Sequence, residues 1–105
     1  MDARLTLLLA VALPLPPVGA QPMRVPLECR LAAGPWQACT MTIEQLGTHW
    51  WLDVGPERFE FRSDGRGSVS LRAGGGSTRA VMPAWNQEQA LCWDGVCARG
   101  EIPLD

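Results

Sequence analysis

The sequence has little of what catalysis or nucleic-acid binding requires. Its 105 residues include one histidine, no tyrosine and nine basic residues, all arginine, against eleven acidic residues. The formal net charge of −2 argues against general nucleic-acid binding, which needs a concentrated basic face. No motif places a nucleophile or metal ligands beside His49, the single histidine. We therefore expect neither a cofactor, nor a bound metal, nor enzymatic activity.

A long hydrophobic run is also lacking. The apolar run at residues 5–13 is well short of the roughly 20 residues that a membrane-spanning helix needs, and Pro14 follows it. Arg4 precedes the run, and small residues up to Ala20 follow it, which is the pattern of a secretory signal with its cleavage site. No basic amphipathic helix is present for a membrane surface.

This pattern predicts a division of the chain. Residues 1–20 are predicted to be a cleaved secretory signal peptide, and residues 21–105 a single β-rich domain. The protein is then secreted or periplasmic, with no stable membrane insertion after cleavage.

Four cysteines lie in the predicted mature part, which suits an oxidising compartment. Asp94-Gly95 is typical of a two-residue hairpin turn, and such a turn places Cys92 opposite Cys97. The other two cysteines are symmetric about a central glycine, so a hairpin with an odd-numbered loop would place Cys29 opposite Cys39. Local geometry thus favours Cys29–Cys39 with Cys92–Cys97, but the nested pairing Cys29–Cys97 with Cys39–Cys92 stays open. The wide spacing of the first pair argues against zinc.

Alternating apolar residues predict several short strands. The apolar residues of two successive predicted strands all have odd numbers: Phe59, Phe61, Val69 and Leu71. They can lie on one face of a hairpin only if its loop has an odd number of residues, and we expect a three-residue loop at residues 63–65. A capping-box spacing at residues 42–47 predicts about one helical turn, and residues 84–90 predict a helical turn or a loop. The expected fold is all-β: a small antiparallel sheet, sandwich or barrel of about seven short strands, stapled by disulfides.

Five tryptophans are many for so short a chain. Alternation places Trp50 inside and Trp51 outside, beside His49 and Asp53, and Trp36 has the same outward parity as Trp51. An exposed tryptophan among polar groups is typical of a protein or sugar contact. Trp51, His49, Asp53 and Trp36 are therefore the candidate binding residues.

The sequence predicts a non-catalytic binding or inhibitor-like module that contacts a protein or an envelope glycan through an exposed aromatic patch. One alternative is a structural accessory protein of an envelope assembly, with an unpaired edge near residues 25–27 or 102–104. The other is a small hydrolase, which would need His49 or a carboxylate in a pocket with a second titratable group.

Overall fold

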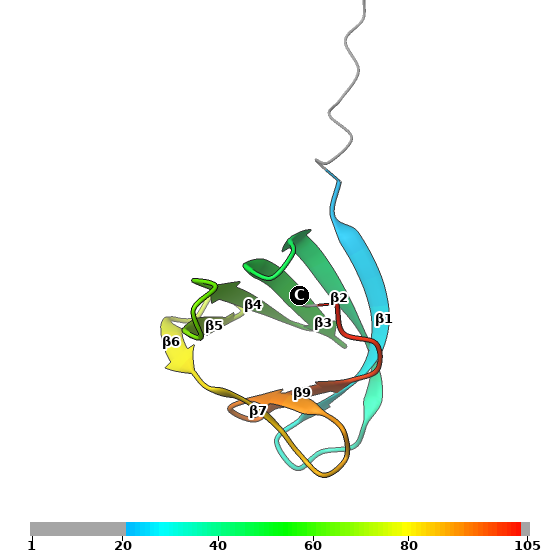
Figure 1. Ribbon diagram of the computed structural model, residues 1–105. Coiled ribbons are helices and arrows are strands. Elements are labelled where there is room, and N and C mark those ends of the chain that lie inside the picture. Colours follow the sequence, from blue (N-terminus) through cyan, green and yellow to red (C-terminus); the bar gives the residue numbers. More distant parts are fainter. Residues whose placement is uncertain (1–20, 104–105) are drawn as a thin grey trace, which may run out of the picture.

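The structure is a computed structural model that describes residues 21–103, so the predicted signal at residues 1–20 lies outside the described part. Nine antiparallel strands form one nearly closed sheet (Figure 1) in the order β6-β5-β4-β3-β2-β1-β9-β8-β7. The strands are β1 (Met23–Leu31), β2 (Gln37–Gln45), β3 (His49–Val54), β4 (Glu57–Ser63), β5 (Val69–Ala73), β6 (Thr78–Val81), β7 (Pro83–Trp85), β8 (Leu91–Trp93) and β9 (Val96–Arg99). The all-β prediction is confirmed, with nine strands instead of about seven.

The chain itself brings the two edges of the sheet together. β6 pairs with β5 at one edge, β7 pairs with β8 at the other, and only Met82 separates β6 from β7. On one side of this junction Arg79 donates to the Asp94 carboxylate, with 3.1 Å between Nε and Oδ2. The sheet is therefore nearly closed without a direct ladder between β6 and β7.

The concave face of the sheet holds the core, as the alternation predicts. Three aromatic rings lie at its centre: Phe61 is 4.7 Å from Trp93 and 5.6 Å from Trp50, centroid to centroid. Trp93 is 1% exposed and points inward, away from the outer Cys92–Cys97 disulfide. The other core residues are Leu27, Cys29, Cys39, Met41, Ile43, Leu52, Val54, Phe59, Val69, Leu71, Val81, Leu91, Val96 and Ala98.

Both locally favoured disulfides are present. Cys92 is directly opposite Cys97 beside a turn in which Asp94 and Gly95 both have positive φ, as a two-residue turn of this type requires. Cys29 bonds Cys39 diagonally, because its direct neighbour on β2 is Gln37, so the expectation of facing cysteines was wrong. Two disulfides are typical of an oxidising compartment.

The β4–β5 loop differs from the three-residue loop expected at residues 63–65. Phe59, Phe61, Val69 and Leu71 do share the buried face, but the register pairs Ser63 with Val69, which leaves five residues in the loop. The Asp64 carboxylate accepts from the backbone N–H groups of Arg66 and Ser68, at 2.7 and 3.1 Å. These bonds hold the pKa of Asp64 below its usual value and organise the longer loop.

The helical turn expected at residues 42–47 is wrong, and the helical turn or loop expected at residues 84–90 is right only for residues 86–90. Residues 42–47 form no helical turn, because β2 continues to Gln45 and Thr42 pairs with Trp51 on β3. Residues 83–85 form β7, followed by a turn in which Asn86 accepts from the backbone of Glu88 and Ala90. Pro83 suits an edge strand because it has no N–H that a further strand would have to accept.

Candidate functional site

The outer face of β3 and β4 brings together three of the four candidate residues. His49, Trp51 and Asp53 alternate outward along β3 and are half-buried or partly exposed. The Arg58 guanidinium lies 4.1 Å from the Trp51 ring centroid, and its Nε forms an ion pair with the Asp53 carboxylate at 3.1 Å. Trp51 therefore does not present a free ring, because a cation covers it.

Glu60 is the centre of this outer cluster, and it was not among the predicted site residues. Its side chain is 8% exposed, and it contacts His49 Nε2 at 2.8 Å, Arg62 at 3.0 Å and Arg72 at 2.7 Å. Burial alone would raise the pKa of Glu60, but the bonds from Arg72 and His49 and the charges of Arg62 and Arg72 together lower it. A lowered pKa keeps this carboxylate ionised, which is the opposite of what a general acid needs.

Trp36 does not join the cluster. It precedes β2 and stacks against Arg99 of β9, with 4.1 Å from the guanidinium carbon to the ring centroid. Trp51 is opposite Thr42, six residues further along β2, so roughly 20 Å of strand separates the two positions. The prediction that Trp36 could share a patch with Trp51 is not supported by this arrangement.

We expect Glu60→Gln to lower the free energy of unfolding by about 1–2 kcal/mol at pH 7, because charge-assisted hydrogen bonds to partly exposed arginines are lost. The pKa of Glu60 is lowered by folding, so its contribution is complete above about pH 4.5 and disappears as the pH falls through the lowered pKa. Urea denaturation between pH 2.5 and 7 measures both effects. The Glu60→Gln profile should be flatter than that of the unmodified protein over the acid range.

Glu57→Gln is the matched control, since Glu57 lies on the same strand and is exposed. We expect it to change the free energy of unfolding by less than about 0.5 kcal/mol. Parallel pH profiles for Glu60→Gln and the unmodified protein would contradict a stabilising role of the cluster.

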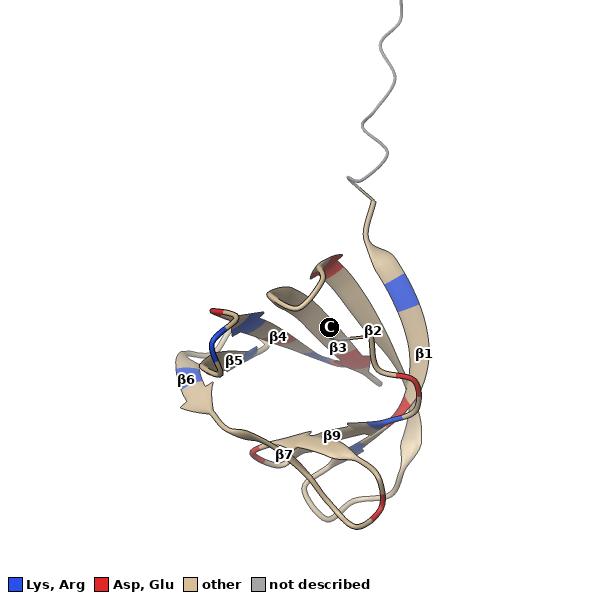
Figure 2. Ribbon diagram, in the orientation of Figure 1, with Lys and Arg blue, Asp and Glu red and all other residues tan. Residues whose placement is uncertain are grey.

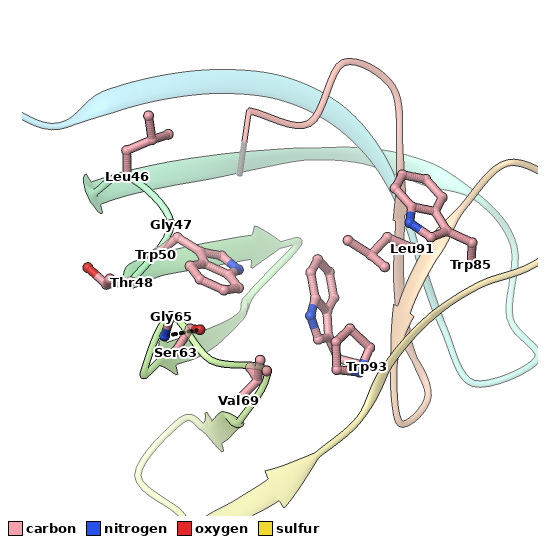
Figure 3. A pocket seen from close by; sticks show the side chains of 12 residues that line it. Leu46, Gly47, Thr48, Trp50, Ser63, Gly65, Val69, Trp85, Leu91 and Trp93 are labelled. Atoms are coloured by element: carbon pink, nitrogen blue, oxygen red, sulfur yellow. Dashed lines mark hydrogen bonds between the residues drawn. The ribbon is translucent and has the colours of Figure 1, made fainter. Parts of the chain in front are cut away.

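A second feature is an aromatic cleft at the junction of the sheet edges (Figure 3), with a volume of about 610 Å³. Figure 3 shows Trp50, Trp93, Leu91 and Trp85 around it. Trp85 is 65% exposed, whereas Trp50 is 3% exposed and its Nε1 has no acceptor within residues 21–103. The remaining lining residues are Leu46, Gly47, Thr48, Ser63, Gly65, Gly67, Val69 and Pro83.

The cleft runs beside a free strand edge. Trp93 and Val96 flank the two-residue turn and form a hydrogen-bonded backbone pair. The backbone N–H and C=O of Cys92, one residue earlier on β8, therefore point to the other side, toward Ala84 of β7. The backbone groups of Pro83 and Trp85 then point away from β8. Within residues 21–103, the N–H and C=O of Trp85 and the C=O of Pro83 are therefore without a backbone partner at this edge.

Sequence reasoning missed both Trp85 and Glu60. Trp85 was assigned to a helical turn or loop, and only closure of the sheet places it in the lining of the same cleft as Trp50 and Trp93. Among residues 21–103, no group of three or more His, Cys, Asp or Glu side chains is placed to bind a metal ion. The described residues also contain no helix of the length and apolarity needed to cross a membrane.

No family model, curated protein or solved structure matches this chain.

Proposed function

We propose that this chain is a secreted or periplasmic, non-catalytic binding module that binds an extended, apolar segment of a partner protein in the aromatic cleft. The observation that carries the proposal is the position of the cleft along the free edge of β7. A free edge offers backbone donors and acceptors to a further strand, and adjacent pockets select its side chains. This proposal moves the aromatic contact from Trp51, which Arg58 covers, to the exposed Trp85.

The chemistry of the cleft supports a binding role. Its lining includes two large exposed apolar side chains, Leu46 and Trp85, together with the buried rings of Trp50 and Trp93. Aromatic side chains at the centre of an interface commonly contribute most of its affinity. An acceptor that reached Trp50 Nε1 would also form a hydrogen bond with a buried donor. Leaving such a donor without a hydrogen bond costs about 1–3 kcal/mol.

The same lining supports a non-catalytic role, because no titratable side chain is among the residues of the cleft. Acid–base chemistry needs such a group within hydrogen-bond distance of the reacting atoms. Secretion is proposed from the signal pattern of residues 1–20 together with the two disulfides.

We expect Trp85→Ala to weaken peptide binding by at least about 30-fold, since truncation of a central aromatic residue commonly removes 2 kcal/mol or more. The ligand for this test is selected from displayed hexapeptides on the oxidised, secreted protein, and its affinity is measured by calorimetry. Selected peptides should alternate apolar and polar residues, as an added strand requires.

Two comparisons make the peptide test specific. Trp36→Ala removes a tryptophan outside the cleft and should leave the affinity unchanged. N-methylation of the peptide residue that faces Trp85 removes the donor to its carbonyl and should reduce the affinity about tenfold, at 1–1.5 kcal/mol for one hydrogen bond. The proposal is wrong if no peptide is enriched, or if Trp85→Ala binds the selected peptide as tightly as the unmodified protein.

A further inference from the structure

The aromatic cleft contains one buried donor that has no acceptor within residues 21–103, the indole N–H of Trp50. Trp50 is 3% exposed, stacks on Phe61 at 5.6 Å between ring centroids, and lies 6.1 Å from Trp93. These contacts hold the indole in one orientation. Figure 3 shows its nitrogen on the side of the ring that faces Trp93, inside the cleft. Trp50 is therefore a positioned donor for a ligand that enters the cleft.

The position of this donor distinguishes it from two others. Trp36 and Trp51 also have an Nε1 without an acceptor in the described part of the chain, but neither ring lines the cleft. The ring of Trp36 is covered by Arg99, 4.1 Å from its centroid. The ring of Trp51 is covered by Arg58 at the same distance, 4.1 Å. Of these three indole N–H groups, only that of Trp50 lies in the lining of the cleft, so the other two serve as internal comparisons.

The groups around this donor favour a neutral ligand group. Figure 2 shows that β7 carries no charged residue, whereas the preceding β6 carries an arginine. No acidic or basic side chain lines the cleft, so a carboxylate or ammonium group would be buried there without a counter-charge. The hydroxyls of Thr48 and Ser63 do line it, and each oxygen has a lone pair for a further donor. A primary amide matches this set, because its oxygen can accept from Trp50 and its N–H groups can donate to hydroxyl oxygens.

The strand geometry of the proposed complex supplies this amide from a side chain. Trp85 lies opposite the buried Leu91, so both side chains are on the concave side of the sheet. A segment along the free edge of β7 pairs its backbone groups with those of Pro83 and Trp85, and every second side chain points to the same concave side. Because Trp50 Nε1 is buried, the side chain has to be long, which favours glutamine over asparagine.

We propose that the partner segment carries a glutamine whose side-chain amide enters the cleft and accepts a hydrogen bond from Trp50 Nε1. This inference rests on the function proposed above, because it specifies the sequence of the segment that binds along β7. Trp50 is then a specificity-determining residue: its N–H adds nothing to the binding of a hydrocarbon side chain and favours one that carries an acceptor.

The first test places glutamine, methionine or glutamate at the inward positions of one selected hexapeptide and measures the affinity by titration calorimetry on the oxidised, secreted protein. We expect glutamine at one inward position to bind about five- to tenfold more tightly than methionine, the effect of one hydrogen bond, and also more tightly than glutamate. Trp50→Phe keeps a ring against Phe61 but removes the donor, so the preference over methionine should disappear. Trp36→Phe removes an N–H outside the cleft and should keep the preference, once thermal melting has shown that both variants fold.

The second test observes the N–H directly and needs no substitution of Trp50. Triple-resonance spectra of the isotope-labelled protein assign the indole N–H signals of its five tryptophans. Addition of the glutamine peptide should move the Trp50 signal downfield, because a new hydrogen bond forms there, and leave the signals of Trp36 and Trp51 in place. Butyramide, a primary amide without a peptide backbone, should produce the same selective shift at high concentration.

The outcomes separate this inference from the peptide function. A glutamine preference that is absent from the unmodified protein, or that survives in Trp50→Phe, would overturn the inference and leave the peptide site standing. An unmoved Trp50 signal in the presence of the glutamine peptide would do the same. If no peptide is enriched, the peptide function is wrong and butyramide decides the amide site: a selective Trp50 shift supports it, and the absence of that shift overturns it.

Discussion

Trp93→Ala is expected to lower the free energy of unfolding by about 3–5 kcal/mol, the range found when a large buried aromatic residue is truncated. Trp93 is 1% exposed and contacts Phe61 and Trp50, so its removal leaves a cavity between strands on opposite sides of the nearly closed sheet. Urea denaturation followed by circular dichroism measures the loss without depending on tryptophan fluorescence. Because the alanine variant could fail to fold, Trp93→Phe provides a milder substitution, with an expected loss of about 1–3 kcal/mol.

Trp85→Ala is the matched control for this prediction, because the same residue type is exposed there. It should alter the free energy of unfolding by no more than about 0.5 kcal/mol. Similar losses for Trp85→Ala and Trp93→Ala would mean that the two rings are equally buried, which would contradict the architecture of the cleft and the peptide test built on it.

The strand pattern could be predicted where one face of a strand is buried. Trp50, Leu52 and Val54 alternate strictly on β3, and all three are buried as expected. The side-chain period of two also required an odd loop between β4 and β5, which is correct. The odd–even pattern of the strands cannot distinguish a three-residue loop from a five-residue one. The longer loop is organised by hydrogen bonds from its backbone N–H groups to the Asp64 carboxylate, which the strand pattern does not encode.

Residues 42–45 and 83–85 form strands instead of helical turns because long-range pairing outweighs local preference. Thr42 has the spacing of a helix cap, but in β2 it lies opposite Trp51 and is buried at 4% exposure. Proline is compatible both with the first turn of a helix and with an edge strand, so Pro83 alone does not distinguish the two. The choice depends on β8, which is stabilised by the Cys92–Cys97 hairpin and then pairs with β7.

The candidate site was predictable only in part for the same reason. Alternation correctly placed His49, Trp51 and Asp53 on one outer face, because they belong to one strand. Glu60 and Arg72 belong to other strands, and the register between β3, β4 and β5 brings them together. Nothing within a short stretch of sequence encodes that register, so the carboxylate at the centre of the cluster could not be found from its neighbours.

The two disulfides should differ in their contribution to stability, and the buried one should contribute more. Cys29–Cys39 joins residues 10 apart and lies in the core, whereas Cys92–Cys97 joins residues five apart on the outer face. By loop entropy the first is worth about 3 kcal/mol and the second about 2 kcal/mol, and replacing the buried sulfurs also removes packing contacts. We expect the double alanine variant at Cys29 and Cys39 to lose the larger share of the free energy of unfolding in urea denaturation.

The double alanine variant at Cys92 and Cys97 tests the disulfide connectivity that the sequence left open. With the present pairing, removal of Cys92 and Cys97 leaves the Cys29–Cys39 bond intact, and peptide mapping without reductant recovers it. In the nested pairing Cys29–Cys97 with Cys39–Cys92, the same variant would leave two free thiols and lose the stabilisation of two long loops, about 4 kcal/mol each. A free-thiol assay on the Cys92→Ala/Cys97→Ala protein therefore decides between the two, and the register that places Cys92 opposite Cys97 predicts no free thiol.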